Sequence, residues 1–87
     1  MNIKYNESFN KHYKKRISSN RSLVVRAKER IGIFVKNPND PILKDHPLKG
    51  KSKGFRAFSI TGDIRVIYQI IEGTAYFFDI GTHNQVY

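Results

Sequence analysis

The N-terminal part of the chain carries hydrophobic residues at the spacing of a strand and then of a helix. Residues Ile3–Tyr5 alternate between apolar and polar, which fits a short strand. Asn6 is a residue type that caps helices, and Phe9, Tyr13 and Ile17 then recur every four residues. This pattern predicts one short strand followed by an amphipathic helix.

A second helix is expected after the polar break at Ser18–Asn20. Its apolar positions form one stripe, and the charged residues between them face mostly solvent. The stripe comprises Leu23, Val24, Ala27, Ile31, Phe34 and Val35. Asn37–Pro38 ends the pattern, because the residue before a proline avoids the helical conformation. The two helices are expected to form a hairpin.

Beyond residue 53 the hydrophobic spacing changes to alternation and short apolar runs. Three segments rich in β-branched and aromatic residues are expected to be strands, namely 55–60, 64–71 and 74–80. Thr61–Asp63 and Glu72–Gly73 are tight-turn sequences, so consecutive strands should pair as antiparallel hairpins. Residues 36–53 hold all three prolines and are expected to lack regular structure. The order is β-α-α-β-β-β, an α+β fold with the two-helix hairpin packed on one face of an antiparallel sheet.

Length and charge narrow the range of functions. The 87 residues allow one domain, residues 1–87, and the net charge of +9 makes a polyanion the default partner. Cysteine is absent, which suits a reducing compartment. No run of 18 apolar residues and no apolar leader is present, so we expect a soluble cytoplasmic protein that does not bind membranes.

Two of the three histidines lie where functional sites occur. His46 falls in a loop held by proline and glycine, and His83 follows the last predicted strand. Histidine is the side chain that titrates near neutral pH without help, so both are candidates for acid–base chemistry. His12, among the lysines of the first helix, is expected to belong to a solvated helix face.

Cations gather in the strand half of the chain. Arg65 stands in the middle of an apolar strand, where an unpaired charge is costly. Its position fits two interpretations, a salt bridge with Asp63 or Asp79, or a guanidinium that grips phosphate. Further cations enter the first long strand and are expected to bind the polyanion; they are Lys49, Lys51, Lys53 and Arg56.

Histidine and cation chemistry on a polyanion is what the residue inventory favours. The seven acids are scattered, and the chain has no His-x-x-x-His, no glycine-rich phosphate loop and no Ser-His-Asp order, so we expect neither a metal nor another cofactor. RNA permits such chemistry. A base takes the proton of the 2′-hydroxyl, that oxygen attacks the adjacent phosphorus, a cation stabilises the phosphorane, and an acid protonates the departing 5′-oxygen.

Several blocks of the sequence, in order and across nearly the whole chain, resemble the RelE/ParE superfamily of bacterial toxins, closest to the YafQ branch. These blocks are Asn37-Pro38, Leu43, Asp45-His46-Pro47-Leu48-Lys49-Gly50, Gly54-Phe55-Arg56, Asp63-Ile64-Arg65-Val66-Ile67-Tyr68, and Ile80-Gly81-Thr82-His83 with Tyr87. The resemblance implies a microbial-ribonuclease-like fold. It also implies a toxin of a type II toxin–antitoxin pair that cleaves messenger RNA in the ribosomal A site and is silenced by a cognate antitoxin.

The resemblance also implies roles for individual residues. His46 matches the loop histidine of the YafQ branch, Asp63 its acidic turn residue, His83 its C-terminal catalytic histidine and Tyr87 its terminal aromatic. Arg65 follows RelE, where an arginine contacts the scissile phosphate. On this hypothesis the two histidines are acid and base, in an order left open, and Tyr87 is a stacker or proton donor.

The same hypothesis gives Arg65 and Arg56 as phosphate stabilisers and Asp63 as an orienting carboxylate. Two positions depart from the YafQ pattern, which has a histidine at Ser59 and a tryptophan at Ile64. Two alternatives remain open. One is a ParE-like toxin that inhibits DNA gyrase by protein binding, and the other is an RNA-binding module without catalysis.

Overall fold

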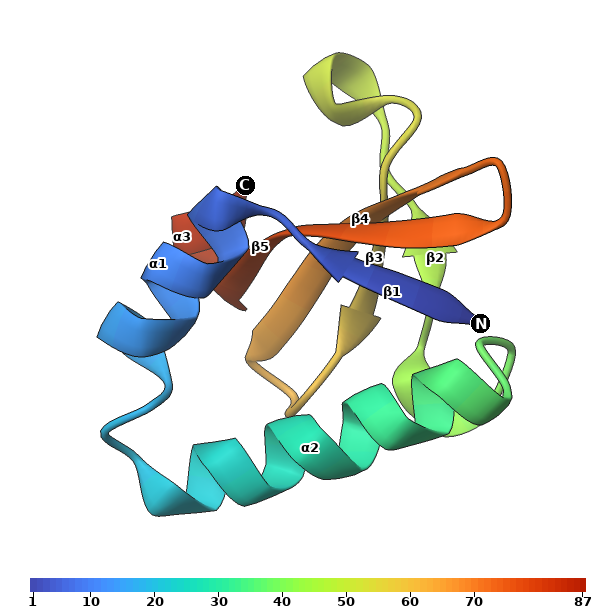
Figure 1. Cartoon of the computed structure of the whole chain (residues 1–87). Coiled ribbons are helices and arrows are strands. Elements are labelled where there is room, and N and C mark those ends of the chain that lie inside the picture. Colours follow the sequence, from blue (N-terminus) through green and yellow to red (C-terminus); the bar gives the residue numbers. More distant parts are fainter.

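One five-stranded sheet forms the centre of the computed structural model, which describes residues 1–87 (Figure 1). In sheet order the strands are β1 (Asn2–Tyr5), β5 (Thr74–Thr82), β4 (Ile64–Ile71), β3 (Arg56–Ser59) and β2 (His46–Pro47). Strands β3, β4 and β5 pair antiparallel, as the turn sequences predict, and the unpredicted strand β2 also pairs antiparallel with β3. Strand β1 pairs parallel with β5, so the sheet is mixed rather than antiparallel throughout. A parallel neighbour requires a long crossover, and the rest of the chain supplies it.

Two helices follow β1 as the apolar spacing predicts. They are α1 (Glu7–Arg16) and α2 (Arg21–Lys36), and the chain breaks between them at the expected place. The side chain of Asn20 caps α2 by accepting a hydrogen bond from the Leu23 N–H at 3.2 Å. Asn6 occupies the cap position of α1 but makes no capping bond with its side chain.

The core lies between these helices and one face of the sheet. Phe9 of α1, Ile17 directly after it, and Ala27 and Phe34 of α2 are buried in it. The ring of Phe34 stacks on Phe58 of β3, with ring centroids 4.7 Å apart. Val35, the last position of the predicted stripe, is exposed. The apolar spacing in the sequence thus identified the buried face of both helices, except at Val35 near the end of α2.

The segment between α2 and β3 was expected to lack regular structure, and this expectation is wrong. It contains a 3-10 turn at Pro41–Leu43, the short strand β2 and a second 3-10 turn at Gly50–Ser52. Asp40 begins the first turn by accepting a hydrogen bond from the Ile42 N–H, and Leu43 is fully buried. Prolines therefore order this segment locally rather than leaving it free.

Alternation along β4 decides which residues reach the face opposite the core. Ile64, Val66 and Tyr68 belong to the core cluster, so Arg65 between them points to the other face. After β5 the chain ends in a short helix, α3 (His83–Val86), that the hydrophobic pattern did not predict. None of the helices is long and apolar enough to cross a membrane.

Candidate active site

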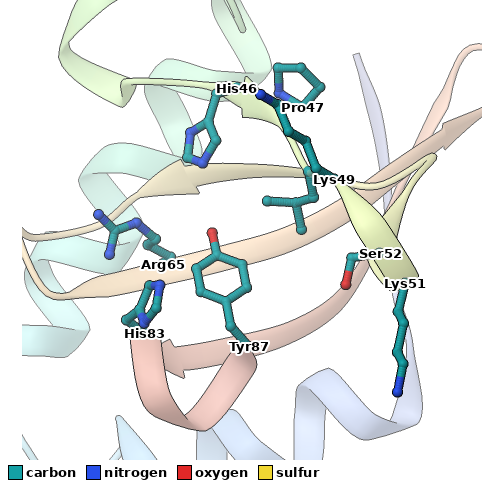
Figure 2. A pocket seen from close by; sticks show the side chains of 9 residues that line it. His46, Pro47, Lys49, Lys51, Ser52, Arg65, His83 and Tyr87 are labelled. Atoms are coloured by element: carbon teal, nitrogen blue, oxygen red, sulfur yellow. The ribbon is translucent and has the colours of Figure 1, made fainter.

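A pocket of about 630 Å³ lies where β2, β4 and α3 meet on the face away from the core (Figure 2). We call it the histidine pocket. It brings together four of the five residues predicted to be catalytic and two of those predicted to bind RNA: His46, Arg65, His83, Tyr87, Lys49 and Lys51. In Figure 2 the side chains of the first four surround a common space. No acidic residue lines this pocket.

His46 stands on the short strand β2, and its ring is fixed by the backbone just before it. Lys44 adopts the left-handed conformation, with φ of 50°, which bends the chain so that its carbonyl meets the His46 ring. The distance from Nδ1 of His46 to that carbonyl oxygen is 3.0 Å. Because a carbonyl only accepts, Nδ1 must carry the hydrogen, and the neutral ring keeps its lone pair on Nε2.

The neighbouring residue, Asp45, ties this loop to the sheet. Its carboxylate accepts hydrogen bonds from Nε of Arg56 on β3 at 2.7 Å and from the hydroxyl of Tyr68 on β4, and it forms an ion pair with Nη2 of Arg56, also at 2.7 Å. The bond to Asp45 raises the pKa of Arg56, although partial burial opposes it. Burial and the same carboxylate raise the pKa of Tyr68. Asp45 thereby holds His46 at the edge of the pocket.

Arg65 is the second residue of β4 rather than in its middle, and it lies opposite Ser59 of β3 and Gly81 of β5. It makes no salt bridge, so of the two interpretations that the sequence left open, pairing with Asp63 or Asp79 is wrong. Its guanidinium is therefore free to bind an anion.

His83 and Tyr87 stand one turn apart on α3. Their rings meet edge to face, with centroids 4.5 Å apart. Burial raises the pKa of Tyr87, while the nearby charge of Arg65 opposes this shift. The helix begins with a capping box, in which Thr82 and Gln85 satisfy each other's backbone N–H groups. This box sets the direction of α3 and so aims both rings into the pocket.

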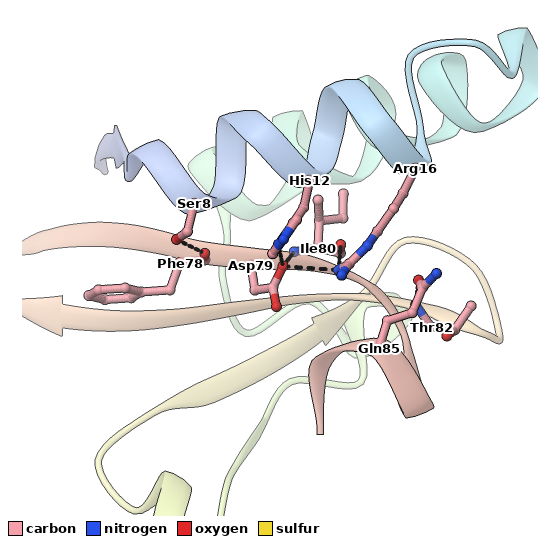
Figure 3. A network of polar contacts seen from close by, with 8 residues as sticks. All are labelled: Ser8, His12, Arg16, Phe78, Asp79, Ile80, Thr82 and Gln85. Atoms are coloured by element: carbon pink, nitrogen blue, oxygen red, sulfur yellow. Dashed lines mark hydrogen bonds and ion pairs between the residues drawn. The ribbon is translucent and has the colours of Figure 1, made fainter.

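His12 is not on a solvated helix face, contrary to expectation. Its Nδ1 lies 2.7 Å from Oδ1 of Asp79, and Nη1 of Arg16 lies 3.2 Å from the same oxygen (Figure 3). Arg16 also donates to the carbonyl of Ile80 at 2.9 Å. These bonds join α1 to the part of β5 that leads into α3, and they explain why Asp79 is not available to Arg65.

Three predicted site residues lie outside the histidine pocket. The guanidinium of Arg56 is bound to Asp45, Lys53 lies beyond the residues that line the pocket, and Asp63 lies in the β3–β4 turn. The backbone N–H of Asp63 donates to Oγ1 of Thr61, and its carboxylate makes no ion pair. The structure therefore does not bring these three residues to the proposed chemistry. No three histidine, cysteine or acidic side chains come together in a way that could hold a metal ion.

Sequence reasoning missed two groups that position the site. Asp45 and Tyr68 lie inside the quoted motifs, but nothing local shows that residues 23 positions apart bond to each other. The capping box at Thr82 and Gln85 had a readable signal, because a threonine followed three residues later by glutamine often begins a helix.

Comparisons with known proteins agree with this fold. The family described as "Bacterial toxin of type II toxin-antitoxin system, YafQ" matches residues 1–87. The crystal structure of YafQ from E. coli strain BL21(DE3) is 26% identical, with a TM-score of 0.81, and the match covers 99% of this chain and 97% of that one. A search of curated protein sequences finds no match.

Two further solved structures are similar over nearly the full length. A chain of the E. coli DinJ–YafQ complex is 25% identical, with a TM-score of 0.81, covering 99% of this chain and 97% of that one. A metal-bound toxin from Helicobacter pylori is 28% identical, with a TM-score of 0.78, covering 100% and 99%. The RelE-like fold is therefore shared by proteins of more than one bacterium.

Proposed function

The chain belongs to the YafQ family of type II toxins, a family of ribonucleases, and from this premise we propose that it cleaves messenger RNA in the ribosomal A site. The observation that carries the proposal is the histidine pocket, where two imidazoles, one unpaired guanidinium and a tyrosine surround one space (Figure 2). RNA supplies its own nucleophile, the 2′-hydroxyl, so these groups suffice for chemistry without a metal.

In the proposed reaction His46 is the base. Its Nδ1 donates to the Lys44 carbonyl, so in the neutral ring the lone pair is on Nε2, which accepts the proton of the 2′-hydroxyl. The 2′-oxygen then bonds to phosphorus, Arg65 stabilises the charge on the phosphorane, and the bond to the 5′-oxygen breaks. His83 protonates the departing oxygen. The products are a 2′,3′-cyclic phosphate and a 5′-hydroxyl.

Lys49 and Lys51 support the binding of the RNA strand, because both line the same pocket and no acidic residue does. Arg56 is not proposed as a phosphate contact, since Asp45 already holds its guanidinium.

We also propose that a cognate antitoxin silences this protein. The similar E. coli toxin has been solved in a complex with DinJ, which supports a partner of that kind here. With a net charge of +9 on the toxin, an acidic docking segment is expected, laid over the basic groove as a helix or strand.

The proposal is tested with purified protein and an RNA oligonucleotide, followed by end-group analysis of the products. We expect cleavage in the presence of EDTA, a cyclic phosphate at the new 3′ end, and no cleavage of DNA of the same sequence. His83→Ala should lower kcat at least about 100-fold, because general acid–base groups contribute 10² to 10⁴ in rate. Lys15→Ala, a cation of α1 outside the pocket, is the matched control and should cleave normally.

Primer extension on a messenger after brief induction, with and without translation blocked, tests the A-site step. Cuts that disappear when translation is blocked would support it. A His83→Ala variant with full activity, or products ending in a 3′-hydroxyl, would contradict the mechanism. Accumulation of relaxed DNA without RNA cuts would favour a gyrase inhibitor instead.

A further inference from the structure

A second pocket, of about 320 Å³, lies where the turn between β3 and β4 approaches α2. Figure 1 shows this turn close to the middle of the helix. We call this second pocket the arginine pocket. The residues that matter for its chemistry are Arg26, Arg30, Lys44, Ser59, Thr61 and Arg65. The proposed reaction uses Arg65 alone among their side chains.

Positive charge in the arginine pocket is not balanced by the protein. Four cations line it and no acid does. The nearest carboxylate, on Glu29, is 56% exposed and lies 3.9 Å from Arg26 and 3.6 Å from Arg30, which makes both ion pairs weak. An anion entering the pocket would meet cations that have no strong competing partner.

Arg30 is a largely buried cation of this pocket. Its side chain is only 12% exposed, and Nη1 donates to the carbonyl of Ile42 at 3.2 Å. Its Nε is buried and has no hydrogen-bond partner, since the oxygen of Glu29 at 3.6 Å is too distant for one. A guanidinium cannot lose its proton, so Arg30 remains a cation in the pocket, with only the weak pair to Glu29 to balance its charge.

Two hydroxyls add donors to the same pocket. Ser59 is only 6% exposed, and its hydroxyl makes no hydrogen bond within the protein. Thr61 Oγ1 accepts from the N–H groups of Asp63 and Ile64, which leaves its own hydrogen free to donate. Guanidinium, ammonium and hydroxyl donors together fit a ligand that has several acceptor oxygens and negative charge, which describes a phosphate.

Arg65 lines both pockets, so the arginine pocket continues the histidine pocket along the surface. We infer that the arginine pocket binds a phosphate of the same RNA strand, next to the phosphate that is cleaved. The inference rests on the proposed function. Only one apolar residue, Ile42, lines this pocket, which disfavours an acidic peptide as occupant. The apolar groove at Tyr5, Phe9 and Tyr13 offers a peptide far more hydrophobic surface.

The test compares Arg26→Glu with Arg21→Glu, a matched charge reversal at another exposed arginine of α2 that does not line the pocket. The probes are a 2′-O-methyl RNA ten-mer, which cannot be cleaved, and a 2′-O-methyl dinucleoside monophosphate, which has one phosphate. Arg26→Glu should weaken ten-mer binding roughly tenfold at about 0.1 M salt, the effect of one lost charge-assisted contact. The slope of log K against log salt concentration should become about 0.7 less steep in this variant, the value for one phosphate contact of a single strand.

A second variant keeps the charge unchanged. Ser59→Ala removes only the buried hydroxyl and should weaken ten-mer binding a few-fold, about the loss of one hydrogen bond, with the salt slope retained. Both variants should bind the dinucleoside monophosphate like the wild type, because its one phosphate occupies the histidine pocket.

Equal losses in Arg26→Glu and Arg21→Glu would overturn the inference, and so would an equal loss on the dinucleoside monophosphate. If Arg26→Glu bound RNA like the wild type but bound a poly-glutamate peptide more weakly, the inference would be overturned in favour of a protein partner. A failure of the proposed function would be distinguishable from a failure of this inference. If the wild type binds the ten-mer with this dependence on Arg26 but cuts unmodified RNA neither free nor in the ribosomal A site, the phosphate site stands and the ribonuclease assignment does not.

Discussion

At position 87 one tyrosine offers two chemistries, a ring that can stack on a base and a hydroxyl that can donate a proton. An acid works best when its pKa lies near the working pH, and burial raises the pKa of Tyr87 further above neutrality. The residue, by contrast, is 47% exposed, and its ring lies at the pocket in edge-to-face contact with His83. These observations favour base stacking as its contribution and leave proton transfer to the histidines.

We therefore expect Tyr87→Phe to keep most of the activity at neutral pH and Tyr87→Ala to lose it mainly through KM. Stacking on an aromatic ring contributes about 1–3 kcal/mol per base, so the loss for alanine should be roughly 5- to 150-fold in kcat/KM. Steady-state cleavage of one RNA substrate measures both variants. A large fall in kcat for Tyr87→Phe with KM unchanged would assign the proton donor to Tyr87 instead.

At the scale of elements, the turn from β5 into α3 controls where His83 and Tyr87 point. Gly81 is buried at this turn, and a Cβ there would lie 2.6 Å from Oε1 of Gln85 and 2.8 Å from Nη1 of Arg16. Neither atom is free to move, because Gln85 Oε1 accepts from the Thr82 N–H at 2.8 Å and Arg16 Nη1 donates to a carbonyl. Glycine is required here for close approach rather than for an unusual φ.

Gly81→Ala should therefore disturb the capping box or the Arg16 contacts, and with them the placement of α3. We expect the free energy of unfolding to fall by about 1–3 kcal/mol, as for other overpacked sites, and cleavage to fall at least about tenfold. Urea denaturation and RNA cleavage measure the two effects. Gly32→Ala on α2, where a Cβ would meet no atom within 4 Å, is the control and should be neutral or slightly stabilising. Equal behaviour of the two variants would show that Gly81 does not position the site.

At the scale of the whole molecule, stability and the site share the contact between Asp45 and Tyr68. Burial of the Tyr68 hydroxyl and its hydrogen bond to the Asp45 carboxylate raise the pKa of Tyr68 above its value in the unfolded chain. Below pH 10 both states keep the proton, and this contribution to stability is fully present. As the pH rises beyond 10 the unfolded tyrosine ionises first, so the free energy of unfolding decreases.

Tyr68→Phe should lower the free energy of unfolding by about 1.5–3 kcal/mol at pH 7, the net value of one hydrogen bond to a charged group. Above pH 10 the free energy of unfolding of this variant should also decrease less steeply with pH than that of the wild type. Urea denaturation between pH 7 and 11 measures both quantities. Tyr5→Phe, which alters an exposed tyrosine without a side-chain hydrogen bond, should follow the wild type. If the free energy of unfolding had the same pH dependence in the wild type and in Tyr68→Phe, the loss of stability above pH 10 would not come from Tyr68.

The sequence by itself determined the order of elements and the residues that gather at the site. Apolar spacing gave α1 and α2, alternation gave β3 to β5, and the turn residues between the strands gave their antiparallel pairing. These features depend on neighbours a few positions apart, so a local pattern contains them. The motifs around His46, Arg65 and His83 marked residues that do line one pocket.

Tertiary structure alone decided which charges are paired and which remain free. Asp79 bonds to His12, 67 positions away, and Asp45 bonds to Arg56, so that Arg65 keeps its guanidinium unpaired. It likewise placed β1 parallel to β5. Such contacts join segments distant in the chain, and packing of the helices on the sheet sets them. No local pattern of residue types distinguishes a cation that will be neutralised by a distant carboxylate from one that will face a substrate.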